Sequence, residues 1–270
     1  MTPGRTLDLN GDVGEGCGDD AALIPLLTSA NIACGGHAGD EATMAAAVRH
    51  AARAGVAIGA HPGHADRANF GRVDRPLEPA AVRRLVVEQV GALLAVVRKA
   101  GAVWMHVKPH GALYHQLARD PALAVAFCDA VALLDRMKGD RGGRCGRPLA
   151  LFGPAGSALE TAAGPAGLRF VAEAFADRAY RADGTLVPRG EPGALLADEV
   201  QAVAQVLSLA RDGRVRAVDG TRVAVRADTL CLHGDTPHAL GFAQRLRAEL
   251  AAVGVALRAA ALGPPEEGGA

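Results

Sequence analysis

Aromatic side chains are scarce in this chain of 270 residues: phenylalanine, tyrosine and tryptophan together make up 3%, with one tryptophan and two tyrosines. So few aromatics argue against the stacking platforms that bind single-stranded nucleic acid, and against aromatic clefts that bind sugars. An excess of charge is also lacking, because 29 Lys and Arg residues balance 29 Asp and Glu residues. Without a basic excess or a polybasic run, we expect neither a nucleic-acid partner nor a membrane partner.

Long apolar runs and paired cysteines are lacking as well. The longest uncharged stretch, 21–39, carries polar residues and glycines, so it does not predict a membrane span. The five cysteines are odd in number and form no C-x-x-C motif, which indicates free thiols in a reducing compartment. Because no leader-like apolar segment follows residue 1, we expect a protein of the cytoplasm.

Three common active-site motifs are missing from the sequence. It contains no P-loop, no strand-linked G-x-G-x-x-G and no G-x-S-x-G nucleophile elbow. Any nucleotide chemistry would therefore need another binding mode or another polypeptide.

Short apolar runs alternate with amphipathic helical stretches along the whole chain. The pattern predicts strands at 6–9, 30–33, 56–60, 103–107, 149–152, 170–174 and 229–232, with a further short strand at 255–259. It predicts helices at 19–27, 40–54, 78–100, 121–137, 194–210 and 239–253. Seven or eight strand–helix units without a break in composition predict one α/β domain over 1–270, a closed parallel barrel. A doubly wound open sheet is the alternative.

Three segments depart from this alternation. The Gly- and Arg-rich segment 138–147 predicts a solvated loop. The segment 215–225, with Asp219 and Gly220 at its centre, predicts a β-hairpin that acts as a flap or as a contact between subunits. We expect the tail, 263–270, to be frayed.

Ionisable side chains follow six of the seven main predicted strands. They are Asp12 and Glu15, His37, His61, Lys108 and His110, then Glu173, Asp177 and Arg178, and finally His233 and Asp235. In a parallel barrel the carboxyl ends of all strands lie on one face, so these side chains should converge there. We therefore expect a functional site on that face.

Each group also has a structural interpretation, as a turn, a helix cap, a core histidine or an ion pair. Lys108 and His110 fit a structural role least well, because side chains two apart on a strand point the same way. Four other histidines lack this context and are expected at the surface or in packing: His50, His106, His115 and His238. Cys34 and Cys231 lie on predicted strands, where inert core thiols are expected.

The ligand types also leave a metal site open. Asp12, His37 and His61 carry side chains that suit zinc or another divalent ion, and His233 is a fourth candidate. His61 and His64 are three residues apart and could chelate from one loop. No H-E-x-x-H spacing supports either set, so the sequence does not decide whether a metal is bound.

Eight motifs, in order along the chain, resemble the LamB/YcsF family, known as the A component of 5-oxoprolinase. The matching segments are 8–15 (DLNGDVGE), 30–40 (ANIACGGHAGD), 59–62 (GAHP), 70–72 (FGR), 107–114 (VKPHGALY), 173–178 (EAFADR) with Tyr180, 183–189 (DGTLVPR) and 232–237 (LHGDTP). The chain departs from the family's usual residues at Gly11, Val13 and Gly36 and in the loop 64–69. None of these departures removes an ionisable residue at a strand end.

The resemblance implies a (β/α)7-type barrel similar to the glycoside hydrolase/deacetylase superfamily. It implies ATP-dependent hydrolytic opening of 5-oxo-L-proline to L-glutamate, with the B and C subunits of 5-oxoprolinase as partners. ATP would be a co-substrate, bound by this chain or by one of those partners. Two other functions remain alternatives: a stand-alone metal-dependent deacetylase or glycan hydrolase of the same superfamily, and a non-catalytic component that only binds a ligand.

Hydrolysis of an activated lactam needs a base, proton carriers and cations, which suggests a role for each strand-end residue. We expect Asp12 or Glu173 to act as base and His61 and His110 to carry protons. Lys108 and Arg178 would hold phosphate and carboxylate. The remaining substrate-binding candidates are Glu15, His37, Asp177, Tyr180, Arg189, His233 and Asp235. Of these, His37 and His233 would orient water or a metal.

Overall fold

Seven parallel strands close into a barrel in this structure, a computed structural model that describes residues 5–138, 146–196, 198–232 and 239–263. In ring order the strands are β1 (Thr6–Val13), β2 (Ser29–Ala33), β3 (Ala57–His61), β4 (Trp104–Val107), β5 (Ala150–Gly153), β6 (Arg169–Phe175) and β9 (Thr229–Leu232). The last of these, β9, pairs back onto β1 and closes the ring. A short strand, β10 (Ala256–Leu257), pairs with the first residues of β1.

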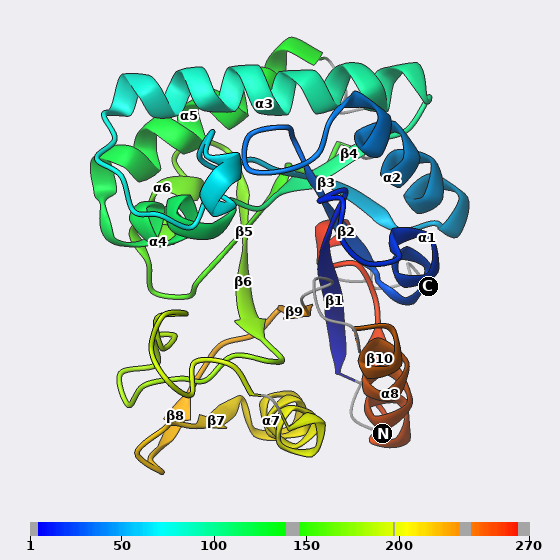
Figure 1. Ribbon diagram of the computed structural model, residues 1–270, viewed down its shortest axis with the longest axis vertical. Coiled ribbons are helices and arrows are strands. Elements are labelled where there is room, and N and C mark those ends of the chain that lie inside the picture. The colour runs from blue at the N-terminus through cyan, green and yellow to red at the C-terminus, as the bar shows by residue number, and fades with distance from the viewer. Residues whose placement is uncertain (1–4, 139–145, 197, 233–238, 264–270) are drawn as a thin grey trace, which may run out of the picture.

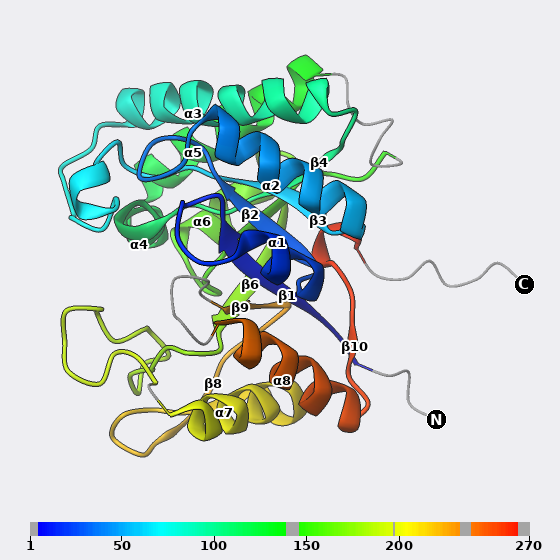
Figure 2. The same ribbon diagram turned by 45° about the vertical axis from the view of Figure 1, so that its right-hand side comes forward.

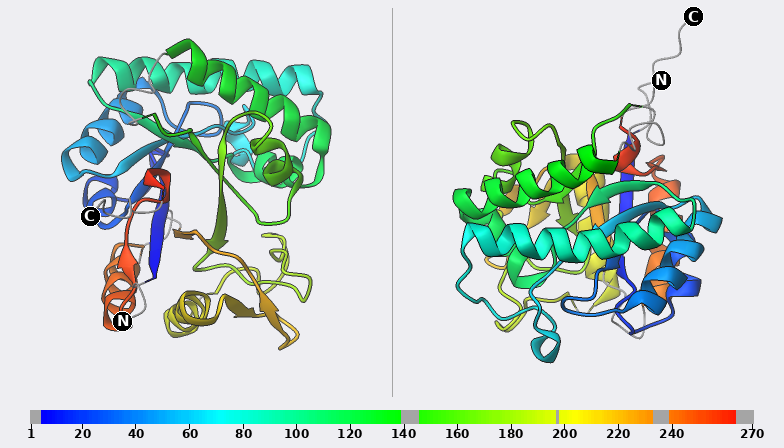
Figure 3. Two further views of the ribbon diagram at one scale, coloured as in Figure 1. Left: turned by 180° about the vertical axis from the view of Figure 1, so that it is seen from behind. Right: turned by 90° about the horizontal axis from the view of Figure 1, so that it is seen from above.

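Helices connect the strands and cover the outside of the barrel (Figure 1). They are α1 (Asp20–Leu23), η1 (Ile24–Leu26), α2 (Glu41–Ala54), η2 (Arg67–Asn69), α3 (Pro79–Lys99), α4 (Gly111–Arg119), α5 (Pro121–Lys138), α6 (Ala158–Ala163), α7 (Glu199–Asp212), α8 (Ala239–Ala252) and η4 (Ala260–Leu262). Figure 2 shows α7 and α8 side by side below the barrel. Figure 3 shows α3 and α5 packed together on the opposite side.

Local signals in the sequence explain where α2 begins and ends. The Asp40 carboxylate accepts a hydrogen bond from the Thr43 backbone N–H, and the Thr43 hydroxyl accepts one from the Asp40 backbone N–H. This reciprocal capping box satisfies donors that the first helical turn leaves unpaired. The helix stops at Gly55, whose φ of 68° is left-handed and costs glycine nothing.

The apolar core fills the layer between the barrel and its helices, where Trp104 and Phe127 are fully buried. The barrel interior is different, because it contains the polar side chains of Asn10, Asn31 and His106, all fully buried. A β-carbon at position 59 would lie 2.0 Å from His106 Nε2, so Gly59 leaves the room in which the imidazole sits. This polar interior positions the site described below.

The predicted parallel barrel is confirmed, and so is the hairpin, which forms β7 (Arg214–Arg216) and β8 (Arg222–Ala224). Strand β1 runs four residues further than expected, because the pairing of Asp12 with Asn31 on β2 continues the ladder. The helix expected at 194–210 begins only at Glu199, capped by Asp198, because Leu195 bridges to Arg178. Helices α4 and α6 were not predicted. Residues 139–145 and 264–270 of the expected loop and tail lie outside the described residues.

Two smaller expectations also have an outcome. The four cysteines in the described part of the chain are all free, as expected. No described helix is both long and apolar enough to cross a membrane.

Candidate functional site

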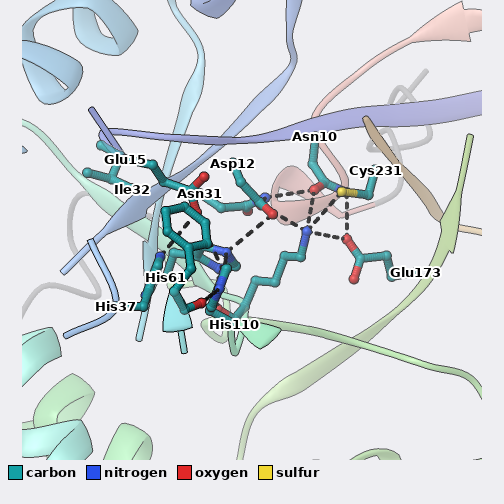
Figure 4. A network of polar contacts seen from close by, with 12 residues as sticks. Asn10, Asp12, Glu15, Asn31, Ile32, His37, His61, His110, Glu173 and Cys231 are labelled. Carbon is teal, nitrogen blue, oxygen red and sulfur yellow. Dashed lines mark hydrogen bonds and ion pairs between the residues drawn. The ribbon is translucent and has the colours of Figure 1, made fainter. Parts of the chain in front are cut away.

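The expected convergence at the carboxyl ends of the strands is present. Figure 4 shows side chains from β1, β2, β3, β6 and β9 pointing toward one another, with those that follow β4 among them. Asp12 lies near the end of β1 and His61 ends β3. Lys108 directly follows β4, and Glu173 lies near the end of β6. The buried site therefore draws on most of the barrel.

Lys108 forms the centre of the site. Its Nζ lies 2.9 Å from Asp12 Oδ1, 3.0 Å from Glu173 Oε1 and 3.0 Å from Cys231 Sγ. Burial alone would lower the pKa of Lys108, but the neighbouring charges, Asp12 first, outweigh it and hold the pKa well above its ordinary value. Lys108 is therefore a permanent cation between two carboxylates. Cys231, expected as an inert core thiol, is buried as expected but contacts this cation.

Two asparagines and a histidine fix the geometry of Asp12. The Asn31 amide donates to Asp12 Oδ1 at 2.8 Å and to Asn10 Oδ1 at 2.7 Å, and its own oxygen accepts from His106 Nε2 at 2.8 Å. Burial, followed by the charge of Lys108, lowers the pKa of His106 to about 3, so the imidazole stays neutral. His106 thus belongs to the supporting network. Its place two residues before Lys108 was the signal in the sequence that could have revealed this.

Three histidines and a glutamate form a second group beside Asp12. His61 Nε2 lies 3.0 Å from His110 Nδ1 and 3.3 Å from Asp12 Oδ2. His37 stacks on His110, with ring centroids 3.6 Å apart, and its Nε2 lies 3.1 Å from Glu15 Oε1. Burial is the main cause that lowers the pKa of His37, and it lowers the pKa of His110 to a greater extent. Both rings are therefore neutral at physiological pH.

This second group could hold a metal ion. Glu15, His37, His61 and His110 each offer a ligand atom, and these atoms all lie within 4.8 Å of one another. The sequence had suggested Asp12 with His37 and His61, so Glu15 and His110 are additions to that set. The alternative chelate of His61 with His64 does not form, because His64 Nε2 instead contacts Gln116 Oε1 at 2.7 Å.

A cavity of about 290 Å³ opens beside both groups, and Asp12, Lys108, Tyr114, Arg72 and Arg189 are among the residues that line it. Among the described residues, the buried Tyr114 hydroxyl and the buried Glu173 Oε2 have no hydrogen-bond partner beyond each other, because the phenol lies against the Glu173 carboxylate. Such atoms cost free energy unless a ligand or water satisfies them. Neither Tyr114 nor Arg72 was expected to have a role in the site, although both lie in the motifs quoted above.

Other expected site residues support a loop. Arg178 is buried and donates to the carbonyls of Val187 and Ala194, and burial lowers the pKa of Arg178 to about 10. The Tyr180 hydroxyl accepts from the Phe175 backbone N–H at 2.8 Å. Arg178 thus fixes the loop that carries Arg189 and also lines the cavity, whereas the Tyr180 side chain anchors the start of this loop to the end of β6.

Three further residues were expected in the site: Asp177, His233 and Asp235. Asp177 is half-buried, and its backbone carbonyl accepts from the Leu196 N–H. His233 and Asp235 lie outside the described residues, so their roles stay predictions.

The family model described as the LamB/YcsF family matches residues 7–263. The chain belongs to this family. A solved structure, the lactam utilization protein from Thermus thermophilus, is 42% identical over 94% of this chain and 100% of that chain, with a TM-score of 0.84. The resemblance inferred from the eight motifs is thus confirmed.

A more distant solved structure shares the fold alone. It comes from Enterococcus faecalis V583, is 12% identical over 94% of this chain and 97% of that chain, and has a TM-score of 0.52. The barrel architecture of this LamB/YcsF member therefore extends to chains with little sequence in common.

Proposed function

We propose that this chain opens the ring of 5-oxo-L-proline to give L-glutamate, as the A component of an ATP-dependent 5-oxoprolinase that also contains the B and C subunits. Membership of the LamB/YcsF family and similarity to a protein named for lactam utilization support a hydrolase that acts on lactams. The observation that carries the proposal is the buried pair of Tyr114 hydroxyl and Glu173 Oε2 beside Lys108, two groups that have no partner other than each other.

A lactam matches that pair chemically. Its ring holds the amide so that the C=O acceptor and the N–H donor lie side by side on one edge. Burial, followed by the charge of Glu173, holds the pKa of Tyr114 well above its ordinary value, so the phenol stays a donor. We infer that Tyr114 donates to the lactam oxygen while Glu173 Oε2 accepts from the lactam N–H.

Ring opening then needs a base and an activated carbonyl. We assign the base to Asp12, because Lys108 and Asn31 fix its Oδ1 while its Oδ2 faces the histidine group. Phosphorylation of the amide oxygen by ATP would make the ring carbon electrophilic enough for water to attack. Arg72 and Arg189 also line the cavity, where they would hold the carboxylate or a phosphoryl group.

Because this sequence has no P-loop, the nucleotide would bind to this chain in another mode or to one of the partner chains. The test is glutamate release from 5-oxoproline by the three purified components, with and without ATP and with each component omitted in turn. We expect release only in the complete mixture with ATP. If a folded, assembled complex releases no glutamate, 5-oxoproline is not the substrate.

Lys108→Met tests the cation in the same assay. Because it would remove the charge between Asp12 and Glu173, we expect turnover to fall at least ~100-fold. Turnover near the wild-type rate would exclude Lys108 from the mechanism.

The group of Glu15, His37, His61 and His110 favours a second candidate, a metal-dependent deacetylase or glycan hydrolase that acts alone. Such an enzyme would act without ATP or partner chains. Release of acetate from an N-acetylated sugar by the isolated, metal-loaded chain would favour this candidate over lactam opening.

A further inference from the structure

Two histidines at the cavity present their lone pairs to each other. His61 Nδ1 lies 2.8 Å from the Lys108 carbonyl, and His110 Nε2 lies 2.9 Å from the Phe70 carbonyl. A carbonyl oxygen only accepts hydrogen bonds, so each of these nitrogens must carry its hydrogen. In a neutral imidazole the other nitrogen then has none. When both imidazoles are neutral, His61 Nε2 and His110 Nδ1, which are 3.0 Å apart, are both acceptors.

Two carboxylates lie beside the contact between His61 Nε2 and His110 Nδ1 and add negative charge there. Asp12 Oδ2 lies 3.3 Å from His61 Nε2, and Glu15 Oε1 lies 3.6 Å from His110 Nδ1. The side chains of these four residues are between 1% and 7% exposed. Lys108 neutralises Asp12, and His37 Nε2 donates to Glu15 Oε1, but none of these four atoms donates to another of the four. A cation at their centre would therefore offset their mutual repulsion.

The separations suit a metal ion. Ligand bonds of about 2.0–2.2 Å with tetrahedral angles place ligand atoms about 3.3–3.6 Å apart. His110 Nδ1 lies 3.0 Å from His61 Nε2 and 3.6 Å from Glu15 Oε1. The rings of His61 and His110 are nearly perpendicular, at 89°, so both lone pairs can converge on one point. We propose that His61 Nε2, His110 Nδ1 and a carboxylate oxygen of Glu15 bind one divalent cation of the zinc type, with Asp12 beside it.

His37 belongs to the group but lies outside this ligand set. Its ring is parallel to that of His110, with an interplanar angle of 2° and centroids 3.6 Å apart. An ion in the plane of the His110 ring is therefore well off the plane in which the His37 lone pairs lie. Instead, His37 Nε2 donates to Glu15 Oε1, the outer hydrogen bond that orients metal-binding carboxylates.

The remaining coordination position would open into the cavity. Glu15, His61 and His110 line the cavity, whereas His37 does not. Three protein ligands with one open position are typical of catalytic zinc sites rather than structural ones. In its chemistry the inference rests on the proposed function, because a metal there would polarise the lactam oxygen or bind the attacking water. Metal binding itself can be measured on this chain alone.

The experiment uses the full chain stripped with a chelator and then titrated with Zn²⁺ or Co²⁺. Metal content is measured by mass spectrometry, and Co²⁺ geometry by its visible absorption. We expect one ion per chain, and binding at least ~100-fold weaker in His61→Gln, His110→Gln and Glu15→Gln. His64→Gln is the matched control, because this neighbouring histidine is buried but pairs with Gln116. It should bind as the wild type does.

His37→Phe tests whether His37 binds the ion itself or only orients Glu15. The variant keeps the ring stack and removes only the hydrogen bond to Glu15, so it should still bind one ion, about 10–100-fold more weakly. Complete loss of binding would overturn the placement of His37 outside the ligand set. Circular dichroism confirms that each variant is folded.

Two results would overturn the metal site itself. Folded wild-type chain that takes up no ion at saturating Zn²⁺ is one, and His110→Gln binding as tightly as wild type is the other. The readout is independent of turnover. A metal-loaded chain in a complex that releases no glutamate would reject the proposed function and leave the metal site standing.

Discussion

Lys108→Met should destabilise the fold strongly, because it leaves two carboxylates buried without their cation. The lysine is 2% exposed, and its ammonium lies 2.9 Å from Asp12 and 3.0 Å from Glu173. Methionine keeps most of the apolar stem but neutralises neither carboxylate. Removing one partner of a buried ion pair costs about 3–5 kcal/mol. In a domain of this size that corresponds to a fall in melting temperature of roughly 6–20 °C.

Urea denaturation followed by circular dichroism measures this loss, provided that unfolding is reversible and two-state. The double variant Lys108→Met/Glu173→Gln supplies the internal control. Because it removes one of the two stranded charges, it should recover at least ~1 kcal/mol relative to Lys108→Met alone. Two results would refute the reasoning: a loss under ~1 kcal/mol in the single variant, or a double variant whose loss equals the sum of both single losses.

Three further predictions concern packing, pH and ligand binding. Gly59→Ala should lower the free energy of unfolding by roughly 1–3 kcal/mol, the usual cost of overpacking, because its β-carbon would meet His106. Gly91→Ala on α3 is the control and should not destabilise the fold, because a β-carbon there would meet no atom of a packed neighbour within 4 Å. Burial raises the pKa of Asp8 to about 6. The neutral carboxyl therefore stabilises the fold below about pH 4, and this stabilisation is lost as the pH rises through 6. Asp8→Asn should flatten the dependence of the free energy of unfolding on pH, measured by denaturation at a series of pH values. Arg189→Met should raise KM for 5-oxoproline in steady-state assays while the melting temperature stays unchanged.

The strands were predictable because each is an apolar run between helical stretches. The end of β1 was not, because its last residues include Asn10 and Asp12, which resemble a loop when read alone. They are strand residues because the barrel interior at this level is a polar network. Helix α4 was missed for a related reason: it follows Pro109 and His110 directly and is only nine residues long.

The site residues were predictable as a set, since parallel strands bring their carboxyl ends to one face. Their partners were not, because pairing depends on register and side-chain reach across the barrel. Lys108 was expected to hold a ligand, which stays a prediction, and its ammonium also contacts Asp12 and Glu173. Arg178 was expected to bind substrate, which stays a prediction too, and besides lining the cavity it donates to the carbonyls of Val187 and Ala194.

We propose that the lactam amide binds at the buried Tyr114 hydroxyl, which has no protein partner other than the Glu173 carboxylate. Tyr114→Phe removes that single oxygen, and Tyr180→Phe is the matched control because its hydroxyl supports the loop. The decisive measurement is kcat for ATP-dependent glutamate release by the reconstituted complex. We predict a fall of about 100-fold for Tyr114→Phe, with the complex still assembled. A kcat within about twofold of wild type would contradict the account.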